Sequence, residues 1–265
     1  MQNFSRDVQL SKAARAGGTL PVPQARGARE RTVSVAAGRT TARDPEGPPS
    51  ATVERYLEAI FYIEVEGEEV HASRLAEWLG VSQPTAGATL RRMASEGLVQ
   101  ASAAKVVSLT DRGRALARAI VRRHRIAERW LTDVLGLDWA TADEEASRLE
   151  HALSEAVTER LYVLIGRPTT CPHGNPIPGA RAERHRERPL SGLAPAEPSR
   201  VRRISEVAEH EAPDLLRFLG AHGFHVGVEV EAVAVSRGAG TFTARVGGRD
   251  VSMSLEVAGR VWIDA

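Results

Sequence analysis

The sequence predicts a mainly α-helical fold with small β parts. Apolar residues recur at helical spacing in several segments between residues 52 and 165. Two β-rich runs flank a small-residue turn at residues 98–110, and alternating apolar residues appear again after residue 200. With 265 residues, of which 42% are hydrophobic, the chain has room for two small domains or for two domains and a tail.

Composition excludes several classes of protein. No apolar run approaches the ~18 residues that a membrane-spanning helix needs, and no apolar segment follows a basic start as in a secretory signal. We therefore expect a cytoplasmic protein that does not bind membranes. Cys171 is the only cysteine, so an intrachain disulfide is impossible. The net charge of +1 argues neither for nor against nucleic acid, since only local clustering of charge bears on that.

Residues 1–50 are rich in Ala, Gly, Arg, Thr and Pro, show no sustained period and end in DPEGPPS. Such a composition cannot bury enough apolar surface to offset chain entropy, so we expect a disordered tail. The tail carries eight Arg or Lys residues against four acids, which leaves a non-specific electrostatic role on DNA open. An inert extension or a misassigned start codon is the simpler alternative.

Residues 51–112 predict a winged helix-turn-helix. A first helix begins near Thr52, and a short second helix, ASRLAEWLG, ends at Gly80. After a Gly-Val-Ser turn, Ser82 can cap a third helix that Gly97 ends. The next stretch, LVQASAAKVVSLT, gives two β-rich runs around a small-residue turn, which is the pattern of a wing.

The charge of the predicted winged helix is unevenly spread. Residues 51–112 hold nine acids and six bases, but the first helix and the turn after it contain Glu58, Glu64, Glu66, Glu68 and Glu69. Arg91 and Arg92 lie on the third helix and Lys105 lies on the wing, so phosphate contacts are expected on that face. Gln83 is the best candidate for a base contact, because its side chain can both donate and accept. The predicted DNA-binding residues are Ser82, Gln83, Pro84, Thr85, Thr89, Arg91 and Arg92. A winged helix used for protein contacts is the alternative.

A long helix is predicted from Thr110 to the sequence GLD, and within it VRRHRIAERW places a histidine on the apolar face. His124 lies four residues after Ile120 and three before Ala127. A lone histidine in such a position is usually a core residue with a hydrogen-bonded neighbour. Glu128 lies one turn further on, however, and an imidazole and a carboxylate at this spacing can clamp one cation.

A second long helix is predicted over TADEEASRLEHALSEAVTERLYVLI, residues 141–165. Its core stripe would consist of Ala146, Leu149, Leu153, Val157, Leu161 and Leu164. Beside that stripe lie Asp143, Ser147, Glu150 and His151. Acids that flank a stripe are usually solvated, but several buried charges of one sign need a cation. The two helices together therefore predict a divalent metal site.

Several motifs in this order resemble the diphtheria toxin repressor family of iron- and manganese-responsive transcription regulators. They are TVERYLEAIFYIE, RLAEWLGVSQPTAGATLRRMASEGLV, VSLTDRGRALARAIVRRHRIAERWL, EASRLEHALSEAV and CPHGNPIPG. The resemblance is close over about residues 51–180 and looser to the end of the chain. It implies a homodimer in which a bound metal orders two winged-helix domains on an operator, repressing metal-uptake genes.

The resemblance also implies the domain organisation. We expect a winged-helix DNA-binding domain at residues 51–112, a helical dimerisation and metal-binding domain at 113–180, a linker at 181–200, and an SH3-like domain of the FeoA kind, a small β-barrel, at 201–265. The last range fits, because it contains RISEV, a short helix PDLLRFLGAHG, and the strand-like runs VGVEVEAVAV, TFTARVGG and VSMSLEV.

One metal site implied by the resemblance matches His124 and Glu128. It has Asp143 where iron-type members place a histidine, and it draws on Glu206 and Glu209 of the third domain. Some manganese-type members also use the Cys and His of a Cys-Pro-His run, which are Cys171 and His173 here. These residues are too many to bind one ion together.

A second implied site matches Glu58, Glu150 and His151. The chain departs from the family pattern twice: Ser147 replaces a Cys or Glu, and Arg55 stands where members place Met or Asp. A guanidinium repels a dication and could pair with Glu150 instead.

The chemistry of these ligands favours Mn(II) or Fe(II) over Zn(II) or Cu(I), because carboxylates outnumber imidazoles and only one thiol is available. Asp143 and the Cys-Pro-His run favour manganese. The alternative is a metal-independent winged-helix module that binds DNA or protein and in which Arg55 replaces an ion. An enzyme is not expected, because the sequence has no His-Glu-x-x-His run, no Gly-x-Ser-x-Gly elbow and no Walker loop.

Overall fold

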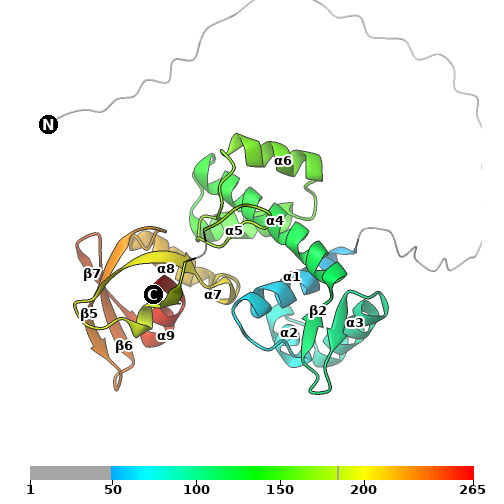
Figure 1. Ribbon diagram of the computed structural model, residues 1–265, viewed down its shortest axis with the longest axis horizontal. Coiled ribbons are helices and arrows are strands. Elements are labelled where there is room, and N and C mark those ends of the chain that lie inside the picture. Colours follow the sequence, from blue (N-terminus) through cyan, green and yellow to red (C-terminus); the bar gives the residue numbers. More distant parts are fainter. Residues whose placement is uncertain (1–48, 184) are drawn as a thin grey trace, which may run out of the picture. The chain divides into compact units, whose positions relative to one another are not determined.

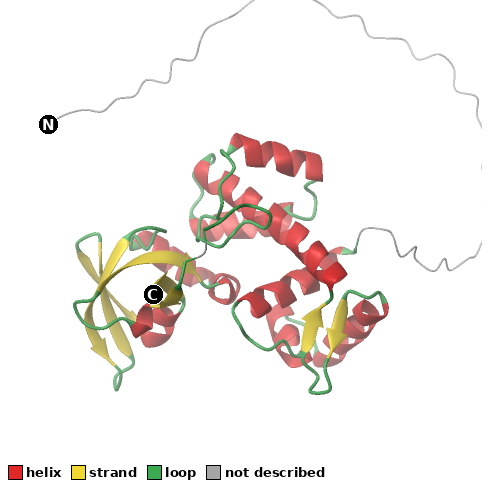
Figure 2. Cartoon of the chain, in the orientation of Figure 1, coloured by secondary structure: helices red, strands yellow, loops and turns green. Residues whose placement is uncertain are grey.

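The computed structural model describes residues 49–183 and 185–265. The predicted tail falls almost wholly on residues 1–48, which lie outside the described residues. Helices make up most of the described chain up to residue 165, and a sheet dominates after residue 186 (Figures 1 and 2). No helix within the described residues is long and apolar enough to cross a membrane.

The winged helix-turn-helix is confirmed. It consists of α1 (Ala51–Val65), α2 (Ala72–Leu79), α3 (Gln83–Ser95), β1 (Val99–Ala101) and β2 (Val107–Leu109). The Ser82 hydroxyl accepts from the Thr85 amide and caps α3, as expected, while Gly80 ends α2 in the left-handed conformation, with φ of 64°. The wing strands pair antiparallel, and the largest fully buried side chains of this domain are Leu57, Ile60, Ile63, Leu75 and Met93.

The long helix α4 (Asp111–Asp133) follows the wing and contains the candidate ligands His124 and Glu128, which are both buried. Thr110 caps it by accepting from the Gly113 amide. A Cβ added to Gly113 would lie 1.9 Å from the Leu98 carbonyl oxygen, so only glycine lets α4 begin this close to β1. Because α4 packs along α1, its inward residues meet those of α1.

The prediction of a single helix over residues 141–165 is wrong. The segment forms two helices, α5 (Trp139–Leu149) and α6 (Glu155–Leu164). Ser154 starts α6 as its N-cap by accepting from the Val157 amide, and this local capping outweighs the continuous apolar period. As a result Val157 and Leu164, expected in the core, are 46% and 65% exposed. Glu150 lies at the C-cap of α5 and is only 1% exposed.

The third domain is a six-stranded antiparallel sheet with short helices. Its strand order is β3-β8-β4-β5-β6-β7, so β3 and β7 are end strands and the sheet does not close into a barrel through hydrogen bonds, although it is consistent with the expected SH3-like class. The strands are β3 (Glu187–Pro189), β4 (Pro198–Ile204), β5 (Glu229–Ser236), β6 (Thr241–Val246), β7 (Arg249–Ser254) and β8 (Val261–Asp264). The helices are α7 (Glu206–Glu211), α8 (Pro213–Ala221) and α9 (Leu255–Gly259), with a 3-10 turn at Leu190–Gly192.

Two boundaries differ from the expected ones. The range expected as a linker, 181–200, contains β3 and the start of β4, so regular structure of the third domain begins near residue 187. The LEV that ends the run VSMSLEV is helical, because Ser254 accepts from the Val257 amide and caps α9.

Two apolar side chains join the third domain to the rest of the described chain. Trp139, at the start of α5, packs into the core of the third domain beside Gly220. Val207 of α7 is fully buried in the core of the winged helix. Val207 directly follows Glu206 in α7, so its burial helps to place Glu206 in the interior.

Candidate metal centre

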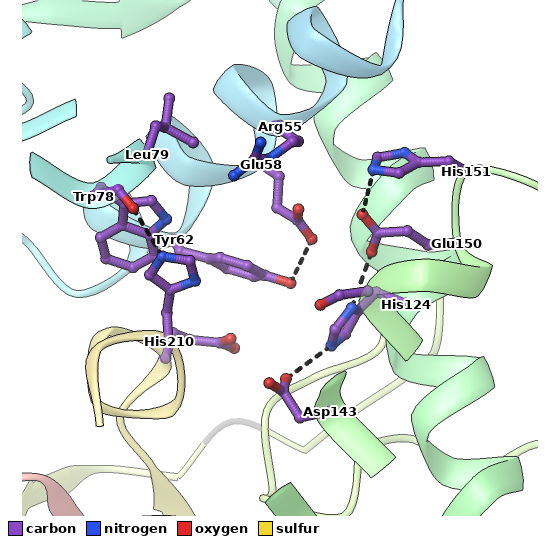
Figure 3. A pocket seen from close by; sticks show the side chains of 12 residues that line it. Arg55, Glu58, Tyr62, Trp78, Leu79, His124, Asp143, Glu150, His151 and His210 are labelled. Carbon is purple, nitrogen blue, oxygen red and sulfur yellow. Dashed lines mark hydrogen bonds and ion pairs between the residues drawn. The ribbon is translucent and has the colours of Figure 1, made fainter. Parts of the chain in front are cut away.

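A first group of candidate ligands is formed by Glu58 of α1, His124 of α4 and Glu150 at the end of α5. One ligand atom from each lies within 4.8 Å of the others. They line a cavity of about 300 Å³, into which Asp143 and His151 also project (Figure 3). We call Glu58, His124 and Glu150 the central cluster. The packing of α1 and α5 against α4 brings together residues that are up to 92 positions apart.

His124 holds its proton between two carboxylates. Its Nδ1 lies 2.9 Å from Glu150 Oε2 and its Nε2 lies 3.3 Å from Asp143 Oδ1. Burial by itself would lower the pKa of the imidazole, but hydrogen bonds to Asp143 and Glu150, together with their charges, raise the pKa well above its ordinary value. The central cluster therefore carries a positive charge on His124 as the structure stands.

Glu58 holds a second proton in the same cavity. Burial and then the charge of Glu150 raise the pKa of Glu58 to about 8, although His124 and the Tyr62 hydroxyl oppose the shift. Tyr62 donates to Glu58 Oε1 at 3.0 Å. Two carboxylates this close cannot both ionise unless a cation joins them, and here protons take that place.

His151 lies at the rim of the cavity. Its Nδ1 is 2.6 Å from Glu54 Oε2, and its Nε2 is 3.3 Å from Glu150 Oε1. Glu54 also accepts from Arg123 at 3.1 Å. The sequence reading missed Glu54, although its place four residues before Glu58 puts both carboxylates on one face of α1.

Arg55 (Figure 3) and Ser147, the two departures from the family pattern, both line this cavity. The pairing of Arg55 with Glu150 that the sequence suggested does not occur: within residues 49–183 and 185–265, Arg55 makes no ion pair. The guanidinium is on an exposed residue of α1. It can therefore turn towards water and leave the central cluster to its own ligands.

A second group consists of Glu128 of α4 with Cys171 and His173 of the loop after α6, which we call the buried cluster. Their side chains are at most 1% exposed, and one ligand atom from each lies within 4.8 Å of the others. Glu128 Oε1 is 2.7 Å from His173 Nδ1. Burial would raise the pKa of Glu128, but the charge and hydrogen bond of His173, together with the charges of His124 and Arg125, hold the pKa below its ordinary value.

The loop that carries Cys171 and His173 is tightly folded against β4. The Cys171 amide donates to the Asn175 carbonyl at 2.9 Å, and the Ile204 amide donates to the His173 carbonyl at 2.9 Å. Gly174 has φ of 91°, and an added Cβ would lie 2.1 Å from the Arg202 carbonyl oxygen. The glycine of the Cys-Pro-His-Gly run is thus required for the loop to approach the third domain.

The structure redistributes the ligands predicted from sequence. His124 groups with Glu58 and Glu150 rather than with Glu128, and Asp143 supports His124. Glu206 forms a buried ion pair with Arg125 instead of joining either cluster, although it lines the central cavity. The side chain of Glu209 lies outside the described residues.

The predicted DNA-binding residues lie together at the start of α3 and along it. Gln83, Pro84 and Thr85 are exposed, and Ser82 is exposed while its hydroxyl caps the helix. Thr89 is half-buried and donates to the Thr85 carbonyl at 3.1 Å. Arg91 and Arg92 are exposed, with Arg92 3.9 Å from Glu96.

Comparison with known proteins agrees with this organisation. Three family models match the chain: "Iron dependent repressor, N-terminal DNA binding domain" at residues 50–107, "Iron dependent repressor, metal binding and dimerisation domain" at 110–179, and "FeoA domain" at 188–265. A winged helix followed by a helical domain rich in metal-ligand side chains and by a FeoA domain defines a class of metal-responsive transcription regulators.

Individual relatives support this class. The diphtheria toxin repressor of Corynebacterium diphtheriae is 35% identical over 222 residues, covering 80% of this chain and 96% of that protein. The iron-dependent repressor IdeR of Mycobacterium tuberculosis is 47% identical over 128 residues, which span 48% of this chain and only 56% of IdeR. A solved structure of a manganese-dependent transcriptional repressor in complex with manganese has a TM-score of 0.71 at 32% identity, covering 80% of this chain and 99% of that one. The chain belongs to the diphtheria toxin repressor family of iron- and manganese-dependent transcriptional repressors.

Proposed function

We propose that this chain is a metal-dependent repressor that takes up Mn(II) or Fe(II) and then binds a palindromic operator to control metal-uptake genes. The observation that carries the proposal is the presence of two inward-facing ligand clusters that both include a residue of α4, the helix that follows directly on the winged helix. A regulator of this kind works where the DNA is, so the proposal places it in the cytoplasm.

The residues of both clusters fit a divalent ion. In the central cluster, two carboxylates and an imidazole face one cavity, and protons on Glu58 and His124 balance their charge. Such an ion supplies two positive charges in place of those protons and draws the three ligands together. The buried cluster offers a carboxylate, a thiol and an imidazole in the same spacing.

Mn(II) or Fe(II) is favoured at the central cluster. Its ligands are oxygen atoms with one imidazole nitrogen, which suit Mn(II) or Fe(II) better than softer ions. Relatives point both ways, since their names include iron-dependent and manganese-dependent repressors.

The link from the metal to the operator runs through α1 and α4. Glu58 belongs to the first helix of the winged helix, while His124 and Glu150 belong to the helical domain. An arrangement that holds all three together binds the ion better than a loose one, so binding shifts the population towards it. In a homodimer, this shift in population sets the spacing between the two α3 helices. The two half-sites of a palindrome require a fixed spacing of this kind.

The exposed ends of α4 and α6 support a dimer. Val134, Leu135, Val163 and Leu164 are each more than half exposed, and the apolar side chains Trp130, Leu137, Leu149 and Leu153 are only partly covered by the described chain. A surface of this kind marks an interface. The matched family model, described as a metal binding and dimerisation domain, covers the same helices.

Metal affinity is expected to rise with pH. Burial and the charge of Glu150 raise the pKa of Glu58 to about 8, and hydrogen bonds to Asp143 and Glu150 raise the pKa of His124, so a metal ion must displace protons from both side chains. Between pH 6.5 and 8 we expect the Mn(II) affinity to increase by on the order of tenfold. Titration calorimetry in buffers of different ionisation enthalpy measures both affinity and proton release; an affinity independent of pH would contradict the protonated state described for Glu58.

Operator binding is expected to depend on Gln83. Replacing the exposed Gln83 by alanine should weaken binding to a palindromic operator by about 1–3 kcal/mol and change non-specific binding little, because one base contact is lost. Titration of DNA in the presence of Mn(II), with Gln100→Ala on the wing strand as a matched exposed control, measures this. Equal losses on operator and random DNA would show that Gln83 does not contact a base. Unchanged binding of the wild-type protein with and without chelator would favour the metal-independent alternative.

A further inference from the structure

The short helix α7 of the third domain is held against the winged helix and the neighbouring helix α4 by three different contacts. Val207 inserts into the apolar core of the winged helix and is fully buried there. His210 stacks on Trp78 of α2, with ring centroids 4.3 Å apart and planes within 2°, and its Nε2 lies 3.0 Å from the Trp78 carbonyl oxygen (Figure 3). The third contact is ionic and is the one that bears on the metal.

The Glu206 carboxylate is paired with the Arg125 guanidinium in the interior. Both side chains are at most 4% exposed, and the Arg125 guanidinium also donates to the Pro176 carbonyl. The guanidinium lies 5.8 Å from the centre of the Tyr62 ring, which adds a favourable cation–π contact. Arg125 is thus fixed between α1, the loop after α6 and α7.

Glu66, just after α1, holds the beginning of the same helix. Its Oε1 accepts from the Glu206 amide at 3.1 Å and from Arg203 Nη1 at 2.6 Å. Arg203 in turn donates to Glu187 at 2.9 Å and lies over the Trp262 ring at 4.4 Å. The hydrogen-exchange rate of the Glu206 amide therefore depends directly on whether the third domain is docked on the winged helix.

We propose that Arg125 supplies to Glu206 the positive charge that a metal ion would otherwise supply. The third domain then stays docked on α4 and the winged helix with or without metal. A buried carboxylate needs one cationic partner, and a guanidinium keeps its charge at any physiological pH. Since Glu206 has this partner within the chain, it is not needed as a ligand. The metal response then belongs to α1, α4, α5 and the Cys171–His173 loop, while Arg125 positions the third domain.

The amide exchange of Glu206, followed by NMR in the full chain, tests this proposal. In the wild-type protein we expect the same slow exchange with chelator and with Mn(II). Arg125→Met leaves Glu206 buried without its cation, so exchange with chelator should be on the order of 100-fold faster. Arg129→Met is the matched control: it lies one turn further along α4, pairs with Asp133 and should leave the exchange unchanged. The Phe224 and Phe242 amides of the third-domain core should stay slow in every variant, which checks the fold.

A second variant keeps the test sharp if Arg125→Met proves unstable. Arg125→Met combined with Glu206→Gln removes both charges, so its exchange should be no faster than that of Arg125→Met alone. Glu206→Gln alone is measured as well. If the increases in exchange rate of the two single variants multiply in the double variant, the Arg125–Glu206 pair does not hold the third domain in place. Wild-type protection that appears only with Mn(II) would also overturn the proposal. The measurements with chelator do not require metal binding. They therefore still test the Arg125–Glu206 pair if the proposed metal-dependent function proves wrong.

Discussion

Replacing His124 by alanine should abolish the metal response while leaving the fold intact, because Glu150 keeps a partner in His151, whose Nε2 lies 3.3 Å from Glu150 Oε1. His124 is the one imidazole of the central cluster and bridges Glu150 and Asp143, so its loss removes one of three ligands and the partner of both acids. We expect Mn(II) affinity to fall by on the order of 100-fold or more, since even changes in supporting residues cost 10- to 100-fold. Operator titration with Mn(II), together with a thermal melt and sedimentation, measures response, fold and dimer separately.

A matched control for this change is His222→Ala. His222 is an exposed imidazole at the end of α8 that contacts the Phe218 carbonyl and lies outside both clusters. It should leave Mn(II) affinity and operator binding as in the wild-type protein. Survival of the full metal response in His124→Ala would show that the central cluster does not hold the activating ion.

Replacing His173 by alanine should have the largest effect on stability. Glu128 is 1% exposed and its carboxylate lies 2.7 Å from His173, so the change leaves a buried negative charge without this partner. Breaking a buried pair in this way costs about 3–5 kcal/mol. Because the pKa of Glu128 is held low in the folded state, the stabilisation is present above the unfolded pKa and is lost as the pH falls. Denaturant unfolding with chelator, at pH 7 and at pH 4, measures both effects.

His225→Ala is the matched control for this second change. His225 contacts the same Trp139 ring edge-on, at 5.1 Å against 4.8 Å for His173, but is exposed and faces no buried acid. Its replacement should alter the free energy of unfolding by less than about 0.5–1 kcal/mol. A similar loss for His173→Ala and His225→Ala would mean that contact with Trp139, and not the Glu128 pair, is what matters.

Local signals were sufficient to predict the winged helix. Its caps and stops are short-range features: Ser82, Gly80 and Thr110 each act where the sequence places them. The inward position of His124 and Glu128 also follows from the spacing of apolar residues on α4. These features depend on neighbours three or four residues away, which a single sequence reveals.

The parts that were mispredicted depend on competition between signals or on tertiary contacts. The apolar period of residues 141–165 favours one continuous helix, whereas Ser154 favours the start of a new one. The cap prevails, and α6 begins after Ser154. The division of ligands into two clusters was not predictable from spacing, since His124 and Glu128 share a face of α4 but meet different partners. The pairing of Glu206 with Arg125 joins residues 81 positions apart and depends on how the third domain docks.

The central claim is that the inward imidazoles and acids of α1, α4, α5 and the Cys171–His173 loop surround divalent ions. Crystals grown with excess Mn(II), measured by anomalous diffraction, test it most directly. We expect anomalous peaks among Glu58, His124 and Glu150 and among Glu128, Cys171 and His173, with Glu206 still on Arg125. Side chains held only by one another and by water, with no peak at either cluster, would contradict it.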